Sequence, residues 1–246
     1  MKLLSSIKWH FKRVYKKVLY FLQIAINPVI QIAGVKLIMD KNWSFNVKDH
    51  MIRKDYETGE IEIIKKNLDS TDIVLEIGTG LGFIAIYCSK IVGQENVTSV
   101  EANPFLESYH TKVFNLNNIH PNVIYNSVGK EEAETTFYID KKNFWSSSLI
   151  PFKSKNLLNI QVKNINVNNL IRDISPTFLI IDVEGFEYEL ISMIKDYQGI
   201  KKIQIETHPQ IIGLSKVEEI IPALSKYSFE LDEYYSKENQ FFFKKA

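Results

Sequence analysis

Cysteine is almost absent from this 246-residue chain, which contains Cys88 and no other. A single cysteine excludes a disulfide within the chain and a cysteine-rich zinc site, and a cytoplasmic location is the simplest expectation. A charge excess is absent too, because 30 Lys and Arg nearly balance 29 Asp and Glu, for a net charge of +1. The body of the chain has no long basic tract with interleaved aromatic residues, so the composition gives no support for a nucleic-acid partner.

A membrane-spanning run is missing as well. Residues 18–30 are mostly apolar, but a spanning helix needs about 20 apolar residues and Pro28 interrupts this stretch. No clear small-residue cleavage site follows, which argues against an export signal. The region before Asp40 is basic without one acidic residue. Residues 1–30 therefore predict a basic amphipathic helix with two open roles: peripheral contact with the inner face of a membrane, or packing against the domain or a partner subunit.

Glycine is scarce, yet three of the ten glycines lie in one short turn. An apolar strand over 74–77 runs into Gly78, Gly80 and Gly82, and a helix-like apolar segment follows from Phe83. Such glycines let a strand reverse into a helix and let a cofactor lie against the backbone. An NAD site usually reads G-x-G-x-x-G, whereas here Phe83 takes the place of the third glycine. The turn therefore predicts a nucleotide-type cofactor other than NAD.

The chemistry of S-adenosylmethionine suits this turn better. Its sulfonium and amino group are cationic and favour a carboxylate such as Glu76, and its ribose diol needs a second acidic acceptor. Glu101 ends a second apolar strand about 20 residues after the glycines, the separation expected of a ribose-binding carboxylate. Together the two features predict a site for S-adenosylmethionine.

Strand-like and helix-like segments alternate after the turn, which is typical of a doubly wound, mainly parallel α/β sheet. We expect seven strands near 73–77, 97–101, 123–126, 178–182, 201–206, 227–233 and 240–244, the last two forming an antiparallel hairpin. We expect helices near 82–92, 105–117, 184–197 and 215–225. Residues 71–246 form the predicted cofactor-binding domain, and residues 1–70 contribute the basic helix, short strands over 29–45 and a lid helix opened by Tyr56 and Glu57.

An insertion at about 134–168 breaks the alternation. It contains strand-like runs over 135–139 and 159–163, and insertions of this length between core strands are usually functional when they are ordered. We expect a flap beside the pocket. Within it, Trp145 could stack on a sugar ring and Ser146 could bind its hydroxyls, although a buried anchor for the flap explains the pair equally well.

Three side chains are the candidate catalytic residues. Ligands of open α/β sheets bind beyond the carboxyl ends of the strands, where Asp182 and Glu184 follow the fourth core strand and His208 follows the fifth. Methyl transfer to a hydroxyl is an in-line displacement that a positioned base assists. We expect Asp182 to face the transferred methyl and any of the three to serve as the base, with His208 also near the acceptor.

Two alternatives remain open at this point. Asp182, Glu184 and His208 could instead hold Mg²⁺ or Mn²⁺ that polarises the acceptor hydroxyl, although a metal is not the favoured expectation. The chain could also be a non-catalytic scaffold that keeps the fold and docks a membrane-bound glycan-synthesis complex.

The sequence resembles the FkbM family of S-adenosylmethionine-dependent methyltransferases. The resemblance rests on the glycine turn, on the segments 100–104 and 116–118, on Ile205-Glu206-Thr207-His208, and above all on Ile181-Asp182-Val183-Glu184-Gly185-Phe186-Glu187. It implies a class I methyltransferase (Rossmann-like) fold and O-methylation, often of a sugar hydroxyl in a glycan, polysaccharide or glycolipid.

The resemblance also extends the expected cofactor site. Tyr56 and Glu57 resemble a pair in relatives linked to surface-polysaccharide synthesis, which suggests a lid over the cofactor. The complete expected set of cofactor-binding residues is Tyr56, Glu57, Glu76, Gly78, Thr79, Gly80, Gly82, Phe83, Glu101, Ala102, Asn103, Ser127 and Asp182.

Overall fold

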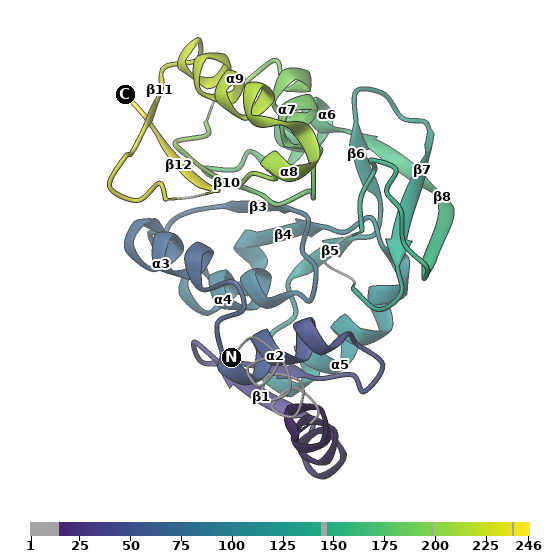
Figure 1. Cartoon of the computed structure of the whole chain (residues 1–246). Helices are drawn as coiled ribbons and strands as arrows, with labels where there is room; N and C mark the ends of the chain where they lie inside the picture. Colours follow the sequence, from purple (N-terminus) through teal and green to yellow (C-terminus); the bar gives the residue numbers. More distant parts are fainter. Residues whose placement is uncertain (1–14, 144–146, 198, 238) are drawn as a thin grey trace, which may run out of the picture.

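The centre of the molecule is a seven-stranded sheet. The computed structural model describes residues 15–143, 147–197, 199–237 and 239–246. The strands of this sheet are β3 (Val74–Ile77), β4 (Val97–Val100), β5 (Asn122–Ile124), β9 (Phe178–Ile181), β10 (Lys202–Glu206), β11 (Phe229–Leu231) and β12 (Gln240–Lys245). Their order is β11-β12-β10-β9-β3-β4-β5 (Figure 1), and all neighbours are parallel except β12, which is antiparallel to β10 and β11. The predicted doubly wound sheet with an antiparallel C-terminal hairpin is confirmed.

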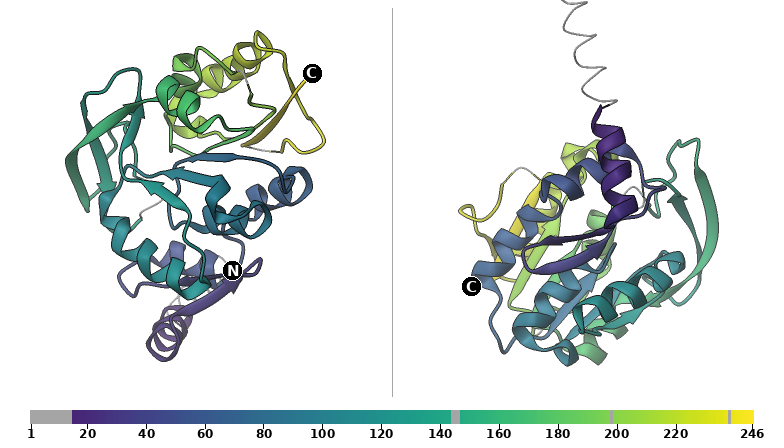
Figure 2. Two further views of the ribbon diagram at one scale, coloured as in Figure 1. Left: turned by 180° about the vertical axis from the view of Figure 1, so that it is seen from behind. Right: turned by 90° about the horizontal axis from the view of Figure 1, so that it is seen from below.

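Helices cover both faces of the sheet (Figures 1 and 2). One face carries α3 (Thr58–Asn67), α4 (Phe83–Val92) and α5 (Glu107–Asn117), and the other carries α6 (Val167–Ile174), α7 (Glu187–Met193) and α9 (Leu214–Ser225). Successive side chains of a strand point to opposite faces, so Val74 joins one core and Leu75 the other. Every residue of β3 and β9 is buried, as expected of strands covered on both sides.

The strand order reverses between β3 and β9, and this is where the two key loops begin. Gly78 follows β3 with a φ of +92°, and a Cβ atom there would lie 1.6 Å from the carbonyl oxygen of Asp182. The backbone of the loop after β9 therefore passes so close that only glycine fits. Ligand sites of open α/β sheets form at such a switch point.

The insertion forms a separate three-stranded sheet beside this edge. Its strands are β6 (Ser127–Gly129), β7 (Glu134–Asp140) and β8 (Leu157–Asn166), in the order β6-β8-β7. The two predicted strand runs lie inside β7 and β8 and are confirmed. The strand predicted over 123–126 corresponds to β5, which ends earlier, at Ile124, and residues 125–126 connect it to β6. Trp145 and Ser146 lie outside the described residues.

Two predictions for the elements are wrong, each because of a local capping or backbone feature. The N-terminal strands end early: β1 (Val29–Ile32) and β2 (Val35–Ile38) form a hairpin, and α2 (Phe45–Arg53) follows because Ser44 caps it, its Oγ accepting from the Val47 amide at 3.3 Å. The helix predicted over 184–197 starts only at 187, because Glu184 and Gly185 have φ values of +49° and +99°.

Helix α6 is absent from the sequence-based expectations. Asn166 caps it by accepting from the amides of Asn168 and Asn169, a signal that lies directly after the long strand β8. The helices expected after the glycine turn, over 105–117 and over 215–225, correspond to α4, α5 and α9 and are confirmed. The short segments η1 (Gln94–Asn96), η2 (Pro104–Leu106) and α8 (Pro209–Ile212) complete the chain.

The described part of the N-terminal helix, residues 15–26, packs one side onto the body. Tyr20 is buried, stacks on Phe45 and donates to Asp49 at 2.5 Å. The other sides expose apolar residues, namely Tyr15, Val18, Leu19, Phe21, Leu22 and Ile26. Among the described residues, no helix combines the length and apolar character that crossing a bilayer requires.

Candidate active site

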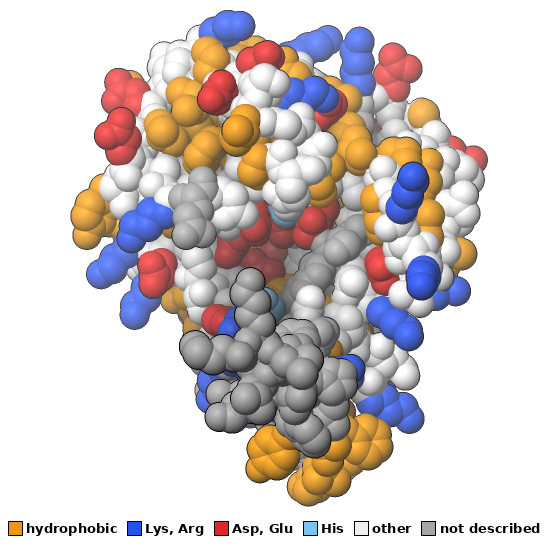
Figure 3. All heavy atoms as spheres, in the orientation of Figure 1, with side chains coloured by type: hydrophobic (Ala, Val, Ile, Leu, Met, Phe, Trp, Pro, Cys, Tyr) orange, Lys and Arg blue, Asp and Glu red, His pale blue; other side chains and the backbone are white. Residues whose placement is uncertain are grey.

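A cavity of about 1210 Å³ opens at the carboxyl ends of the parallel strands. Its walls come from the glycine turn, the loops after β4, β9 and β10, the start of α3 and the flap. Figure 3 shows this hollow, with acidic side chains gathered at its floor. A cavity of this size and position, between the cofactor turn and the flap, is large enough for two ligands side by side.

Most of the predicted site residues line this one cavity. The lining residues from that set are Tyr56, Glu57, Glu76, Gly78, Thr79, Gly80, Phe83, Glu101, Ala102, Ser127, Asp182, Glu184 and His208. Gly82 and Asn103 do not line it. Gly82 begins α4 with Phe114 against its backbone, and the Asn103 side chain caps η2. Both residues therefore shape the turns that carry their neighbours.

Glu101 ties the end of β4 to the glycine turn. Its two carboxylate oxygens accept from the amides of Gly80 at 2.9 Å and Asn103 at 2.7 Å. Burial raises the pKa of this carboxyl to about 7, against the lowering effect of those hydrogen bonds. The carboxylate is thus fixed in position at the edge of the cavity.

Glu76 is held in a similar way by hydroxyl groups of the glycine turn and of β4. Its Oε2 accepts from the hydroxyls of Thr79 and Ser99, and burial raises its pKa to about 7. Thr79, predicted as a cofactor residue, therefore acts on Glu76 through its side chain. Ser99 was not predicted, and its inward place on the central strand β4 is the only signal that could have found it.

His110 supports the turn and was also missed. Its Nε2 lies 2.8 Å from the Gly80 carbonyl oxygen and its Nδ1 lies 2.8 Å from the Tyr125 hydroxyl, while its ring stacks on Phe114 at 5.3 Å. This buried histidine connects α5 to the glycine turn. No sequence signal distinguishes it, because the contact depends on how α5 packs.

The three predicted catalytic residues come together. The Nε2 atom of His208 lies 3.2 Å from Glu184 Oε2 and 3.9 Å from Asp182 Oδ1. Burial raises the pKa of Asp182 well above its usual range, and the nearby negative charges add to this effect. Burial likewise raises the pKa of Glu184, to about 7, although the charge of His208 opposes it.

Glu187 completes this group and was not among the expected site residues. Its side chain is fully buried, and one oxygen accepts from the Gly185 amide and contacts His208 Nδ1, both at 2.7 Å. Burial lowers the pKa of His208, but the Glu187 hydrogen bond and the surrounding carboxylates outweigh it and raise the pKa to about 9. The second glutamate of the D-x-E-G-x-E run is the signal for this role.

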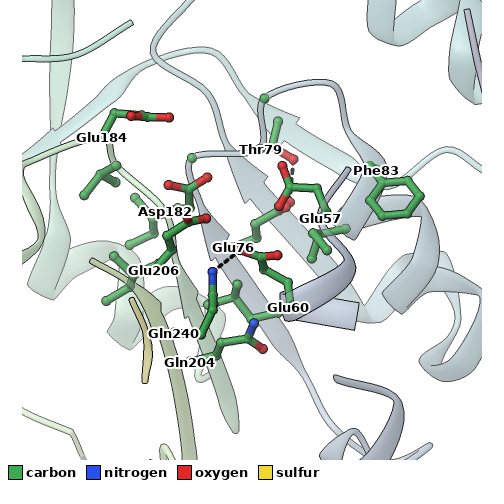
Figure 4. A pocket seen from close by; sticks show the side chains of 18 of the residues that line it. Glu57, Glu60, Glu76, Thr79, Phe83, Asp182, Glu184, Gln204, Glu206 and Gln240 are labelled. Atoms are coloured by element: carbon green, nitrogen blue, oxygen red, sulfur yellow. Dashed lines mark hydrogen bonds between the residues drawn. The ribbon is translucent and has the colours of Figure 1, made fainter. Parts of the chain in front are cut away.

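A second acidic cluster lines the same cavity beside Asp182 (Figure 4). It consists of Glu57, Glu60 and Glu206, and Gln240 donates from Nε2 to Glu60. Burial raises the pKa of Glu57 and Glu206 to about 8 and that of Glu60 to about 7. Sequence analysis named only Glu57. A polar Glu206 on the interior strand β10 and the three-residue spacing from Glu57 to Glu60 are the signals for the others.

These residues fit S-adenosylmethionine. The cofactor is cationic, and the cavity concentrates carboxylates around the glycine turn, with Asp182 Oδ1 buried and without a hydrogen-bond partner. A positive group placed there would satisfy that oxygen and offset the repulsion among the acids. Glu101 offers fixed carboxylate oxygens of the kind that accept from a diol.

A comparison with models of known protein families agrees with this assignment. The model of the methyltransferase FkbM domain matches residues 72–231. A methyltransferase from Pyrococcus furiosus aligns with 94% of this chain and 98% of its own at 12% identity and a TM-score of 0.49. The ribosomal protein L11 methylase from Lactobacillus delbrueckii subsp. bulgaricus aligns with 89% and 98% at 13% identity and a TM-score of 0.48. No curated protein sequence matches the chain.

Proposed function

Because this chain belongs to the FkbM methyltransferase family and is an S-adenosylmethionine-dependent methyltransferase, we propose that it methylates a hydroxyl group of a sugar in a cell-surface glycan, polysaccharide or glycolipid. The observation that carries the proposal is the group of Asp182, Glu184 and His208 at the switch point, directly beside the glycine turn. Bound S-adenosylmethionine supplies an activated methyl group on its sulfonium. The chain supplies the alignment and the base.

Asp182 is the proposed base. Its unpartnered Oδ1 is placed to take the acceptor's hydroxyl proton as the oxygen attacks the methyl carbon. His208, oriented by Glu187, puts positive charge 3.9 Å from that oxygen and favours its ionised form. Glu184 pairs with His208 Nε2, the nitrogen that faces Asp182, and limits how far the His208 ring turns.

The acceptor class is supported by the polar character of the cavity. Carboxylates and the amides of Gln204 and Gln240 line it together with the aromatic ring of Phe137 from the flap. Carboxylates and amides accept and donate hydrogen bonds in the paired manner that neighbouring sugar hydroxyls require. Trp145 and Ser146 stay predictions as acceptor-binding residues.

The first experiment separates cofactor binding from turnover. Calorimetric titration with S-adenosylhomocysteine should show micromolar binding that Glu101→Ala loses and that Glu107→Ala, an exposed glutamate on α5, retains. Asp182→Ala should keep binding and lose turnover, and a fully active Asp182→Ala enzyme would exclude the assigned role. Absence of binding by the folded protein would favour the scaffold alternative.

The acceptor is tested with a methyl-labelled cofactor. After incubation with extracted glycans and hydrolysis, mass spectrometry should find the label as a methyl ether on a monosaccharide. Label on a nitrogen atom or on protein would contradict the proposed acceptor class.

A metal-assisted version remains an alternative proposal, because the ligand atoms of Asp182, Glu184 and His208 lie within 4.8 Å of one another. We favour the version without a metal at this cluster, since His208 Nε2 lies 3.2 Å from Glu184 Oε2 and the two side chains pair with each other directly. Metal affinity that survives Glu184→Gln would reject the alternative; affinity that Glu184→Gln destroys would establish it.

We also propose that the N-terminal helix contacts an anionic membrane surface on the cytoplasmic side. Ile26 and Phe21 expose 83% and 62% of their surface, and Lys17 is exposed on the same helix, whereas Lys16 pairs with Asp49. Such a contact has two requirements: apolar residues that enter the membrane interface, and basic residues that face the anionic headgroups. Glycolipid and membrane-linked acceptors would thereby be brought to the enzyme.

Vesicle sedimentation tests this contact. The full chain should bind vesicles rich in phosphatidylglycerol, and the double variant Phe21→Asp, Ile26→Asp should lose most binding. Leu214→Asp, which alters an exposed apolar residue on α9, is the matched control and should bind normally. Equal binding by both variants would contradict the proposal.

A further inference from the structure

The proposed methyl-transfer step gives no chemical role to Glu60 and Glu206, and it places Glu57, their neighbour, only in the expected lid over the cofactor. Glu57 precedes α3, Glu60 lies on that helix and Glu206 ends β10, so two separate elements bring the three together. One carboxylate oxygen of each lies within 4.8 Å of the other two. Figure 4 shows them converging below Asp182.

Two buried amides next to the cluster have unsatisfied atoms. The side chain of Gln204 lines the cavity with 1% exposure, and neither its Oε1 nor its Nε2 has a hydrogen-bond partner. Gln240 donates from Nε2 to Glu60, but its Oε1 is also buried without a partner. Leaving a buried polar atom unpaired is unfavourable, because the atom has lost its water without gaining a partner. Gln204 in particular indicates that this part of the cavity holds a ligand.

The charge of the cluster calls for a cation. Within the described part of the chain, none of the three carboxylates forms an ion pair with a lysine or arginine. Carboxylates packed this closely repel one another when they ionise, and a divalent cation held between them removes that repulsion.

We propose that Glu57, Glu60 and Glu206, with the amide oxygen of Gln204, form a binding site for a divalent metal cation. A set made only of oxygen atoms suits a hard cation such as Ca²⁺, Mn²⁺ or Mg²⁺. Ligand distances of about 2.3–2.6 Å around Ca²⁺ put opposite ligands about 4.6–5.2 Å apart, and the observed spread of the carboxylate oxygens lies within that span.

The site would act on the neighbouring catalytic group through charge. Glu206, Glu57 and Glu60 all repel the ionised form of Asp182. A bound divalent cation would offset that repulsion and favour the ionised form of Asp182, which is the form that can act as a base. The binding site itself is independent of the proposed sugar acceptor, and binding of the metal alone tests it.

The test is calorimetric titration of the metal-stripped full-length protein with CaCl₂ and, separately, with MnCl₂. We expect one site per chain with a dissociation constant below about 1 mM, weakened at least about tenfold by Glu206→Gln and by Gln204→Leu. Glu184→Gln, in the neighbouring cluster, should bind the metal normally. Titration with S-adenosylhomocysteine reports whether each variant is folded. If Glu206→Gln does not fold, Gln204→Leu remains as the test, because leucine fills the space of the glutamine side chain without its amide.

Two results would overturn the proposal. One is the absence of binding of either metal at about 10 mM. The other is binding that only Glu184→Gln weakens, which would place the cation on Asp182, Glu184 and His208. Neither result depends on methyl transfer, so the proposed function is tested separately.

Discussion

Glu187 illustrates how much one buried carboxylate controls at the residue scale. It holds the Gly185 amide and His208 Nδ1 with the same oxygen, and so links the strained loop after β9 to the loop after β10. Glu189, two residues further on the same helix, pairs with Lys216. Two glutamates with similar sequence surroundings thus have different physical roles.

Glu187→Gln should lower kcat at least about tenfold, because the ring of His208 loses its charged partner and its orientation. The dissociation constant of S-adenosylhomocysteine and the KM for the cofactor should stay unchanged, which a general loss of structure would not allow. Glu189→Gln is the control and should be nearly normal. An unchanged kcat in Glu187→Gln would contradict the positioning role.

At the scale of elements, the flap forms one wall of the cavity and also contacts the loop after β9. Ser148 forms a backbone bridge with Tyr138 of β7, and its hydroxyl donates to the Glu184 carbonyl oxygen at 2.6 Å. Glu184 adopts a φ of +49°, which is unfavourable for a residue with a side chain. The flap therefore helps to hold the catalytic loop in this conformation.

Ser148→Ala should lower the free energy of unfolding by about 1–2 kcal/mol, since the Glu184 carbonyl loses its donor. It should also lower kcat several-fold with little change in cofactor affinity. Ser154→Ala removes a hydroxyl bonded to Asp140 at 2.6 Å in the same insertion and is the control for stability alone. Chemical denaturation and steady-state kinetics measure both effects; equal kcat in the two variants would reject the link between flap and catalytic loop.

At the scale of the whole molecule, the buried carboxylates link stability to pH. Glu76 and Glu101 have pKa values raised to about 7 by burial, against usual values of 4.5. The folded state therefore binds more protons than the unfolded state between these pH values, and the free energy of unfolding falls as pH rises from about 4.5 to about 7. Each group contributes on the order of 3 kcal/mol to this loss.

The cofactor-free protein should therefore have a higher Tm near pH 5.5 than near pH 7.5. Glu76→Gln cannot ionise, so this variant should lose part of the difference, and a saturating cationic ligand should reduce it as well. Thermal unfolding at both pH values measures the effect. An identical pH dependence in Glu76→Gln would show that this carboxyl does not contribute.

The sequence by itself determined the order of elements and most of the cofactor turn. Buried strands such as β3 and β9 are continuous apolar runs, and Gly78 occupies a position where a Cβ atom would collide with the neighbouring loop. These are local requirements of strand burial and backbone geometry, so they leave a direct signal in the chain. The placement of Asp182 and His208 at one edge followed from parallel topology alone.

Only the tertiary structure decided which polar side chains meet. Glu206 and Gln204 lie far along the chain from Glu57 and Glu60, and His110 reaches the glycine turn through the packing of α5. Short-range signals do not encode such contacts, because they depend on how helices lie on the sheet. The same holds for the pKa values of the acids. Burial sets these values, and burial is a property of the folded chain that the sequence does not give directly.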